Sequence, residues 1–216
     1  MISGNIKKRF YTSLILLTLI ILIFKYDFIL IFSLIILGIF SILEFFNISK
    51  KLFRKKLYLI SSNIFFTIYV FIFCFMFIFF SNFVQLKIIL YILLLGCVAS
   101  DIGGYIFGKI IKGPKLTKIS PNKTIAGSIG SFILTSMLIS GLFFYLTKNF
   151  SLNIIVVSVL TSFGCQLGDI LFSFLKRRAS LKDTGNLLPG HGGVLDRLDG
   201  IFVGLPIGFL SLVLIY

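Results

Sequence analysis

Acidic residues are scarce in this chain. Only seven of its 216 residues are Asp or Glu, the charged fraction is 13%, and tryptophan is absent. A soluble domain of this size keeps about a quarter of its residues charged, so a soluble globular domain is excluded. The apolar runs between the charge clusters are so long that only lipid or other apolar segments can surround them. The sequence therefore predicts a polytopic membrane protein.

Cysteine is also sparse. Cys74, Cys97 and Cys165 lie far apart in apolar stretches, which excludes both a disulfide framework and the close spacing of a metal site. We interpret them as small core residues. The amino-terminal run has the basic start of a signal peptide but no small-residue cleavage site after it, which favours a retained first helix.

The apolar runs predict about seven helical spans, and the predicted fold class is an all-α transmembrane bundle. The first two spans and the last are shorter than the roughly 20 residues that cross a hydrocarbon core. Local thinning of the bilayer and snorkelling of Lys25 would accommodate them, and the alternative is a first pair that forms a hairpin without fully crossing. The predicted spans are Phe10–Phe24, Phe28–Leu43, Leu57–Phe80, Leu86–Ser100, Ile125–Thr147, Leu152–Leu175 and Ile201–Tyr216.

Basic residues are distributed unevenly over these spans. Of the 21 Lys and Arg residues, 18 fall on one side, and only Lys25, Lys87 and Lys148 fall on the other. This bias places the N-terminus and the basic loops in the cytoplasm, and predicts a multi-pass protein of the inner, cytoplasmic cell membrane. A net charge of +14 would also suit nucleic acid, but the placement of the charges argues against nucleic acid and favours anionic lipid and an anionic substrate. The cytoplasmic set is Lys7, Lys8, Arg9, Lys50, Lys51, Arg54, Lys55, Lys56, Lys109, Lys112, Lys115, Lys118, Lys123, Lys176, Arg177, Arg178, Lys182 and Arg197.

The two halves of the chain differ in polar content. Residues 1–95 read as N-terminal transmembrane helices with almost no chemical motif. Their exception is Glu44, which we interpret as a solvated residue near the end of the second span. Residues 96–216 read as a C-terminal catalytic transmembrane region with polar loops that face the cytoplasm. Five of the seven acids lie there: Asp101, Asp169, Asp183, Asp196 and Asp199.

The first polar block of this region is rich in glycine and lysine. It runs from Ser100 to Lys109 and continues from Lys118 to Thr124. Ser120-Pro121 predicts a helix start, with Ser as the N-cap and Pro in the first turn. Free amides at such a start, together with Lys123, would form a site for phosphates. A cytoplasmic loop with a turn and orientation-setting lysines is the open alternative.

The second block, Gly164 to Asp169, lies inside an otherwise apolar span. A carboxylate there is costly unless it faces a partner or a wet cavity, so Asp169 is a candidate functional residue. The alternative is a structural ion pair with Lys176.

The third block runs from Ser173 to Asp199. If a helix starts near Val194, Asp196 and Asp199 lie three residues apart on one face. Together with Asp169 they would attract a hard cation such as Mg²⁺, with substrate phosphates completing its coordination. The alternative is that the two acids balance Arg197 and the Lys176–Arg178 cluster. His191 lies between glycines, where it could donate to a phosphate.

At this block the sequence resembles the phosphatidate cytidylyltransferase family. The family signature is Ser, a spacer, Lys-Arg, four residues, Lys-Asp, then Pro-Gly-His-Gly-Gly and Asp-Arg-x-Asp, and it is complete from Ser173 to Asp199. The segments Asp101–Tyr105, Ser120–Thr124 and Gln166–Asp169 also match in order, so the resemblance covers about residues 96–200. Two positions depart from the family pattern: Ala126 and Phe172 stand where Glu is usual.

The resemblance implies transfer of the cytidylyl group of CTP to phosphatidic acid, giving CDP-diacylglycerol and pyrophosphate. It implies Mg²⁺, with a second monovalent or divalent cation left open, and makes a homodimer a candidate assembly. The implied metal ligands are Asp169, Asp196 and Asp199. The implied nucleotide contacts are Ser120, Pro121, Lys123, Thr124 and, more weakly, Asp101. The remaining implied catalytic residues are Lys176, Arg177 and Lys182, which would neutralise phosphates, with Asp183, His191 and Arg197.

Three other functions agree with parts of this pattern. A related CTP-using lipid kinase, acting on polyprenol or phytol, would transfer the γ-phosphoryl group and need a base to accept the alcohol proton. A cytidylyltransferase for a different lipid phosphate would keep the same chemistry. A transporter or channel would use Asp169 along an ion path, but it predicts polar residues spread through several spans, whereas here they gather in cytoplasm-facing blocks.

Overall fold

The computed structural model describes every residue except 1–17, 20, 118, 122, 186–191 and 216. Within these described residues, six helices are long and apolar enough to cross a membrane. The predicted all-α, multi-pass fold is confirmed, and the predicted first span, Phe10–Phe24, falls largely outside the described residues. The helices are α2 (Asp27–Leu52), α3 (Lys56–Ser81), α4 (Val84–Ile110), α5 (Ile125–Thr147), α6 (Leu152–Arg178) and α7 (Leu195–Ile215).

Three helices are considerably longer than the sequence predicts. α2 continues past Leu43 to Leu52, α4 continues past Ser100 to Ile110, and α7 begins at Leu195 instead of Ile201. With 26 residues at 1.5 Å each, α2 is about 39 Å long, so it can cross the hydrocarbon core without thinning the bilayer. The sequence does not predict these extra turns because they carry polar residues. A span predicted from an apolar run stops at the first polar residues, even where the helix continues.

Large apolar side chains cover much of the helix surface. Phe28, Phe65 and Leu214 are 80%, 76% and 84% exposed. A soluble protein rarely leaves so many such residues in water, whereas lipid tails solvate them. This surface agrees with a membrane location.

Packing divides the chain into two compact units, which are described separately. The first comprises Met1–Phe83 and Leu175–Leu198, and the second comprises Val84–Phe174 and Asp199–Tyr216. Each unit therefore combines an early segment of the sequence with a late one.

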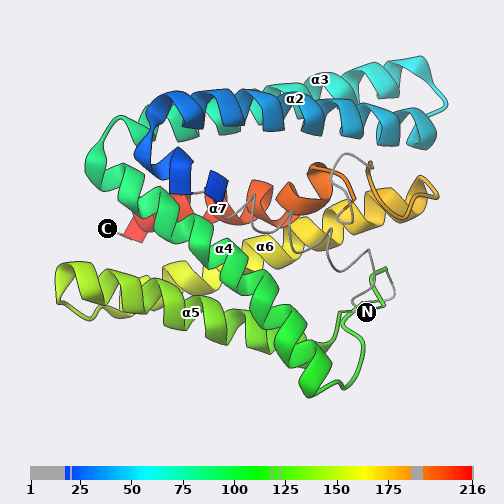
Figure 1. The fold of residues 1–216 in the computed structure, drawn as a ribbon. Coiled ribbons are helices and arrows are strands. Elements are labelled where there is room, and N and C mark those ends of the chain that lie inside the picture. The colour runs from blue at the N-terminus through cyan, green and yellow to red at the C-terminus, as the bar shows by residue number, and fades with distance from the viewer. Residues whose placement is uncertain (1–17, 20, 118, 122, 186–191, 216) are drawn as a thin grey trace, which may run out of the picture. The chain divides into compact units, whose positions relative to one another are not determined.

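In the first unit, α2 and α3 lie side by side as an antiparallel pair (Figure 1). The rings of Phe45 and Phe66 stack with their centroids 4.0 Å apart. One turn further along α2, the Ser49 hydroxyl donates to Asn63 Oδ1 at 2.8 Å. The partner number falls on α3 as the residue number rises on α2, which is the register of an antiparallel hairpin.

In the second unit, α4 and α5 pack at close range (Figure 1). A Cβ added to Gly103 would lie 2.5 Å from the carbonyl oxygen of Gly130, so the two backbones are almost in contact. Small residues permit this approach, which is the usual basis of helix association in membranes. Hydrogen bonds across the contact add to it, because the Ser131 hydroxyl donates to the Ser100 carbonyl at 2.7 Å.

α6 and α7 also approach through glycine in the second unit. A Cβ added to Gly168 would overlap the carbonyl oxygen of Asp199, and one added to Gly204 would overlap the Cys165 sulfur. Cys97 and Cys165 are buried free thiols, and Cys74 is a partly buried one, as the sequence predicts.

Gly103→Ala is expected to destabilise the protein by about 1–3 kcal/mol, because the added methyl group must force α4 and α5 apart. Chemical unfolding in detergent measures this change. Gly141→Ala is the control, since a Cβ there meets no atom within 4 Å; it should be neutral or stabilising by up to about 1 kcal/mol. Equal effects of the two substitutions would contradict the close packing of α4 on α5.

Candidate active site

The loop between α4 and α5 is closed at its base by backbone hydrogen bonds in the second unit. The Leu116 N–H donates to the Lys123 carbonyl at 2.7 Å, and the Ile125 N–H donates to the Pro114 carbonyl at 3.0 Å. This pairing fixes the two ends of the loop beside the start of α5.

Thr124, and not Ser120, caps the helix that follows this loop. Its side chain accepts from the Gly127 N–H at 3.1 Å, and α5 begins at the next residue. The prediction that Ser120-Pro121 starts a helix is wrong. Instead, the Lys123 N–H donates to the Ser120 carbonyl at 3.0 Å and closes a turn, with Pro121 at its second position. Proline suits that position because its fixed φ matches the turn.

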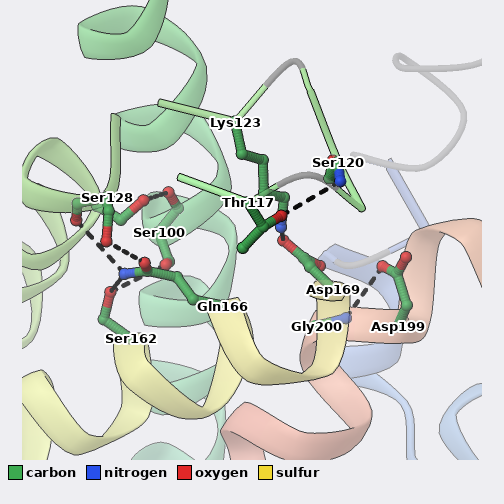
Figure 2. Close-up of polar contacts among 11 residues, drawn as sticks. Ser100, Thr117, Ser120, Lys123, Ser128, Ser162, Gln166, Asp169, Asp199 and Gly200 are labelled. Atoms are coloured by element: carbon green, nitrogen blue, oxygen red, sulfur yellow. Dashed lines mark hydrogen bonds and ion pairs between the residues drawn. The ribbon is translucent and has the colours of Figure 1, made fainter. Parts of the chain in front are cut away.

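An ion pair joins this loop to α6. Lys123 Nζ lies 2.5 Å from Asp169 Oδ2, and the two side chains are 29% and 20% exposed (Figure 2). The alternative reading, in which Asp169 pairs with Lys176, is wrong, because Lys176 has a different carboxylate partner. The intramembrane carboxylate thus faces the cation of the predicted phosphate-binding loop.

A polar network surrounds the same region of α6. Gln166 Oε1 accepts from the Ser128 hydroxyl, and Gln166 Nε2 lies 3.4 Å from the Ser162 hydroxyl oxygen (Figure 2). Ser162 in turn is 3.0 Å from Ser100. The network ties α4, α5 and α6 together one turn from Asp169, so the Gln-x-Gly-Asp element has a structural role beside its carboxylate.

Asp199 lies in the neighbourhood of Asp169 within the second unit (Figure 2). Its Oδ1 accepts from the Gly200 N–H at 3.0 Å, and a Cβ added to Gly200 would lie 2.9 Å from Asp169 Oδ1. The close approach of α6 and α7 therefore brings two of the three predicted metal ligands together. Carboxylate oxygens are among the ligands that Mg²⁺ takes, together with water and phosphate oxygens, so the donor type fits this ion.

Asp196 belongs to the first unit and is surrounded by protein donors. Its Oδ1 lies 2.6 Å from Lys176 Nζ, and the side chains are 8% and 11% exposed. Its Oδ2 accepts from the Thr184 N–H at 2.8 Å, the Thr184 hydroxyl at 3.0 Å and the Gly193 N–H at 3.0 Å. Three donors therefore share Oδ2, and Lys176 contacts Oδ1.

Asp196 thereby holds Thr184 and Gly193, which lie in the connection between α6 and α7 (179–194, called the signature loop below). Its predicted role as a metal ligand stays a prediction. Over the described residues, no three His, Cys, Asp or Glu side chains gather as a ready metal cluster.

Glu44 is the residue that the sequence analysis missed. Its interpretation as a solvated end residue is wrong, because its side chain is 3% exposed. It accepts from the Thr184 hydroxyl at 2.6 Å and from the N–H groups of Val194 and Leu195 at 2.9 and 2.8 Å. Sequence spacing could not reveal this, since the partners lie some 150 residues away.

A pocket of about 420 Å³ lies beside Thr184 in the first unit. Lys50 and Lys51, in the last turn of α2, form part of its wall. The other lining residues are Asn47, Leu181, Asp183, Thr184 and Gly185. The pocket therefore joins the basic end of a membrane-spanning helix to the Lys-Asp element of the signature.

The other predicted site residues lie on three helices and in a loop. Asp101 is exposed on α4, Arg177 is exposed in the last turn of α6, and Arg197 is exposed in the first turn of α7. Lys182 and Asp183 are exposed in the loop after α6. His191 lies outside the described residues. The two departures from the family pattern also differ in placement, since Phe172 is buried and Ala126 lies in the first turn of α5.

The chain thus combines helices of membrane-spanning length with a lysine-bearing loop that faces an intramembrane carboxylate. The profile of the cytidylyltransferase family matches residues 3–215. The chain belongs to that family.

Curated relatives agree with this assignment. The chain is 43% identical over 112 residues to the phosphatidate cytidylyltransferase of Staphylococcus haemolyticus (strain JCSC1435), covering 50% of this chain and 42% of the relative. It is 42% identical over 120 residues to that of Helicobacter pylori (strain ATCC 700392 / 26695), covering 52% and 42%. It is 41% identical over 125 residues to that of Staphylococcus aureus (strain COL), covering 56% and 47%. The matched segment thus spans slightly less than half of each relative.

Lys176→Met is expected to lower the free energy of unfolding by about 3 kcal/mol or more, because it leaves the buried Asp196 carboxylate without its cation. Chemical unfolding in detergent is the measurement. Arg177→Met removes the same charge from an exposed neighbour and should change stability by less than about 0.5 kcal/mol. Similar losses of unfolding free energy in both variants would show that the Lys176–Asp196 pair does not stabilise the protein more than an exposed charge does.

Proposed function

We propose that this chain transfers the cytidylyl group of CTP to phosphatidic acid and releases CDP-diacylglycerol and pyrophosphate. The observation that carries the proposal is the complete signature from Ser173 to Asp199 in a chain of the cytidylyltransferase family. The relatives named phosphatidate cytidylyltransferase support the choice of lipid substrate.

The proposed reaction needs no general base. A phosphomonoester with a second pKa near ~6 is largely dianionic at neutral pH. One of its oxygens attacks the α-phosphorus of CTP, the bond from that phosphorus to the bridging oxygen breaks, and pyrophosphate leaves with the electron pair. No proton has to move, so the difficulty lies in bringing two polyanions together.

Cationic side chains supply part of the charge compensation. Lys123 and Lys176 are each held by one carboxylate, at 2.5 and 2.6 Å. We assign Lys123, Ser120, Pro121 and Thr124, with Asp101 as a weaker candidate, to the nucleotide. Lys176, Arg177, Lys182, His191 and Arg197 are assigned to the phosphates of the lipid and of pyrophosphate, and Asp183 is a further predicted catalytic residue.

Mg²⁺ is the proposed cofactor, with Asp169 and Asp199 as the side chains best placed to hold it and Asp196 as the third predicted ligand. When bound, the ion would offset negative charge on the phosphates. A second monovalent or divalent cation remains part of the prediction from the family resemblance.

The proposed setting is the inner cell membrane, with the basic loops in the cytoplasm. The first unit supports this orientation, because Lys50 and Lys51 of α2 line the same pocket as Leu181 and Asp183. Two of the basic clusters therefore lie at one end of that unit, as the charge bias requires. The proposed partners are CTP, phosphatidic acid and the bilayer, without nucleic acid; the homodimer rests on the resemblance alone.

The pocket beside Thr184 is the proposed entry for the lipid phosphate. Lys50 and Lys51 stand at the end of a membrane-spanning helix, where lipid headgroups lie, and lysines at that level attract anionic lipid. Thr184 connects the pocket to Asp196, so a headgroup bound there would reach the signature loop.

Purified protein with CTP, phosphatidic acid and Mg²⁺ is expected to form CDP-diacylglycerol and pyrophosphate in equal amounts. Asp169→Asn should lower the rate at least about a hundredfold, because it removes a carboxylate charge from the proposed metal site, and EDTA should abolish product. Chromatography of the labelled lipid and an enzymatic pyrophosphate assay measure both products.

The nucleotide product separates this function from its rivals. CDP in place of pyrophosphate, with a lipid alcohol as acceptor, would replace the proposal with a lipid kinase. Product from another lipid phosphate but not from phosphatidic acid would keep the chemistry and change the substrate. No nucleotide turnover with any lipid, by protein that unfolds cooperatively, would contradict the proposal.

Lys50→Gln/Lys51→Gln is expected to raise the KM for phosphatidic acid about thirtyfold, since each lysine near anionic lipid contributes about 1 kcal/mol and two are removed. The KM for CTP should change little. Lys55→Gln/Lys56→Gln is the matched control, because it removes the same charge from exposed positions at the start of α3. Mixed-micelle kinetics at fixed total anionic lipid make the comparison. Equal increases in the KM for phosphatidic acid in both double variants would show that Lys50 and Lys51 act only through general surface charge.

A further inference from the structure

We propose that Glu44 is a positioning residue, which fixes the start of α7 and, through Thr184, the carboxylate of Asp196. The effect of Glu44 on catalysis rests on the proposed function, whereas the hydrogen bonds that Glu44 makes do not depend on it. The residue comes from α2, in the half of the chain where the sequence carries almost no motif.

The geometry shows a carboxylate used on both oxygens. Oε1 accepts from the Val194 N–H at 2.9 Å, and Oε2 accepts from the Leu195 N–H at 2.8 Å and the Thr184 hydroxyl at 2.6 Å. With 3% of its surface exposed, Glu44 has little access to solvent. A buried charge of this kind is stable only while its donors stay in place.

These donors stand at the N-terminus of α7. The first N–H groups of a helix have no partner inside the helix, and a nearby side chain in the sequence usually caps them. Here the cap is supplied by a different helix, and its negative charge also suits the positive end of the helix dipole. Glu44 therefore determines where α7 begins and which way its first turn points.

Thr184 extends this control to Asp196. Its hydroxyl oxygen lies 2.6 Å from Glu44 Oε2 and 3.0 Å from Asp196 Oδ2, and its N–H donates to the same Asp196 oxygen at 2.8 Å. A hydroxyl has one proton for two carboxylates, and the shorter distance assigns it mainly to Glu44. Moving Glu44 would redirect that proton and change the hydrogen bonds of Asp196.

The packing leaves little room for an alternative arrangement. A Cβ added to Gly193 would overlap both Thr184 Oγ1 and a Glu44 carboxylate oxygen, and one added to Gly185 would lie 2.6 Å from Glu44 Oε1. Gly185 and Gly193 thus both lie against the Glu44 side chain, and the absence of a Cβ at these two positions makes the close approach possible.

Glu44→Gln tests the link with little change of shape. The amide nitrogen would face an N–H or O–H donor, so at least one of the three hydrogen bonds is lost. Asp27→Asn is the matched control, because it makes the same chemical change at an exposed position on the same helix. Hydrogen exchange followed by mass spectrometry should show faster exchange over residues 192–198 in Glu44→Gln and wild-type exchange in Asp27→Asn.

Kinetics test whether the link serves the reaction. Glu44→Gln and Thr184→Val should each lower kcat about tenfold, the loss expected for a hydrogen bond to a charged group, with KM for CTP changed less than about threefold. The double variant should be no slower than either single one, because both act through one chain of contacts. Thr184→Ser keeps the hydroxyl and should restore most of kcat.

The outcomes separate this inference from the proposed function. If wild-type protein makes no CDP-diacylglycerol, the proposed function is wrong. Hydrogen exchange over residues 192–198 then still tests whether Glu44 holds the start of α7. Unchanged exchange in Glu44→Gln, or kcat losses that multiply in the double variant, would overturn the positioning role. If Glu44→Gln does not fold, Thr184→Val with Thr184→Ser decides, and equal activity in those two would also overturn it.

Discussion

A carboxylate in the interior of a membrane protein is tolerated only where donors surround it, and three acids of this chain impose that condition on the rest of the structure. Asp169 is paired with Lys123, Asp196 with Lys176, and Glu44 with Thr184 and two amides of α7. Each of these contacts joins segments that are distant in sequence. The few charges of the chain therefore act as connections between helices.

Close helix packing and the site depend on each other. Gly168 and Gly200 let α6 and α7 approach so nearly that Asp169 and Asp199 become neighbours. A larger residue at either position would separate the helices and the two acids together. Small residues, which in membranes mainly serve helix association, here also set the spacing of two carboxylates.

The arrangement suits a reaction between two polyanions. Lys123 and Lys176, which would contact phosphates in the proposed reaction, already pair with carboxylates at 2.5 and 2.6 Å. Their positive charges are therefore compensated within the protein. An incoming phosphate then competes for a lysine whose position is fixed. In that exchange the lysine replaces one anionic partner with another. Most of the free-energy cost of removing the lysine from water is therefore met during folding, and less of it during binding.

The sequence by itself determined the membrane class, six of the spans in outline and the signature from Ser173 to Asp199, since hydropathy and motif spacing are local properties of the chain. It gave α5 its observed bounds but wrongly added a helix start at Ser120-Pro121, because a turn and a helix cap use the same residue types. It ended α2 too early, at Leu43, because polar residues inside a helix resemble a helix end. Only the tertiary structure decided that Lys123 faces Asp169 and that Glu44 is buried under the signature loop. Those contacts depend on which helices pack together, and the packing energy that selects them is spread over apolar side chains that look alike in sequence.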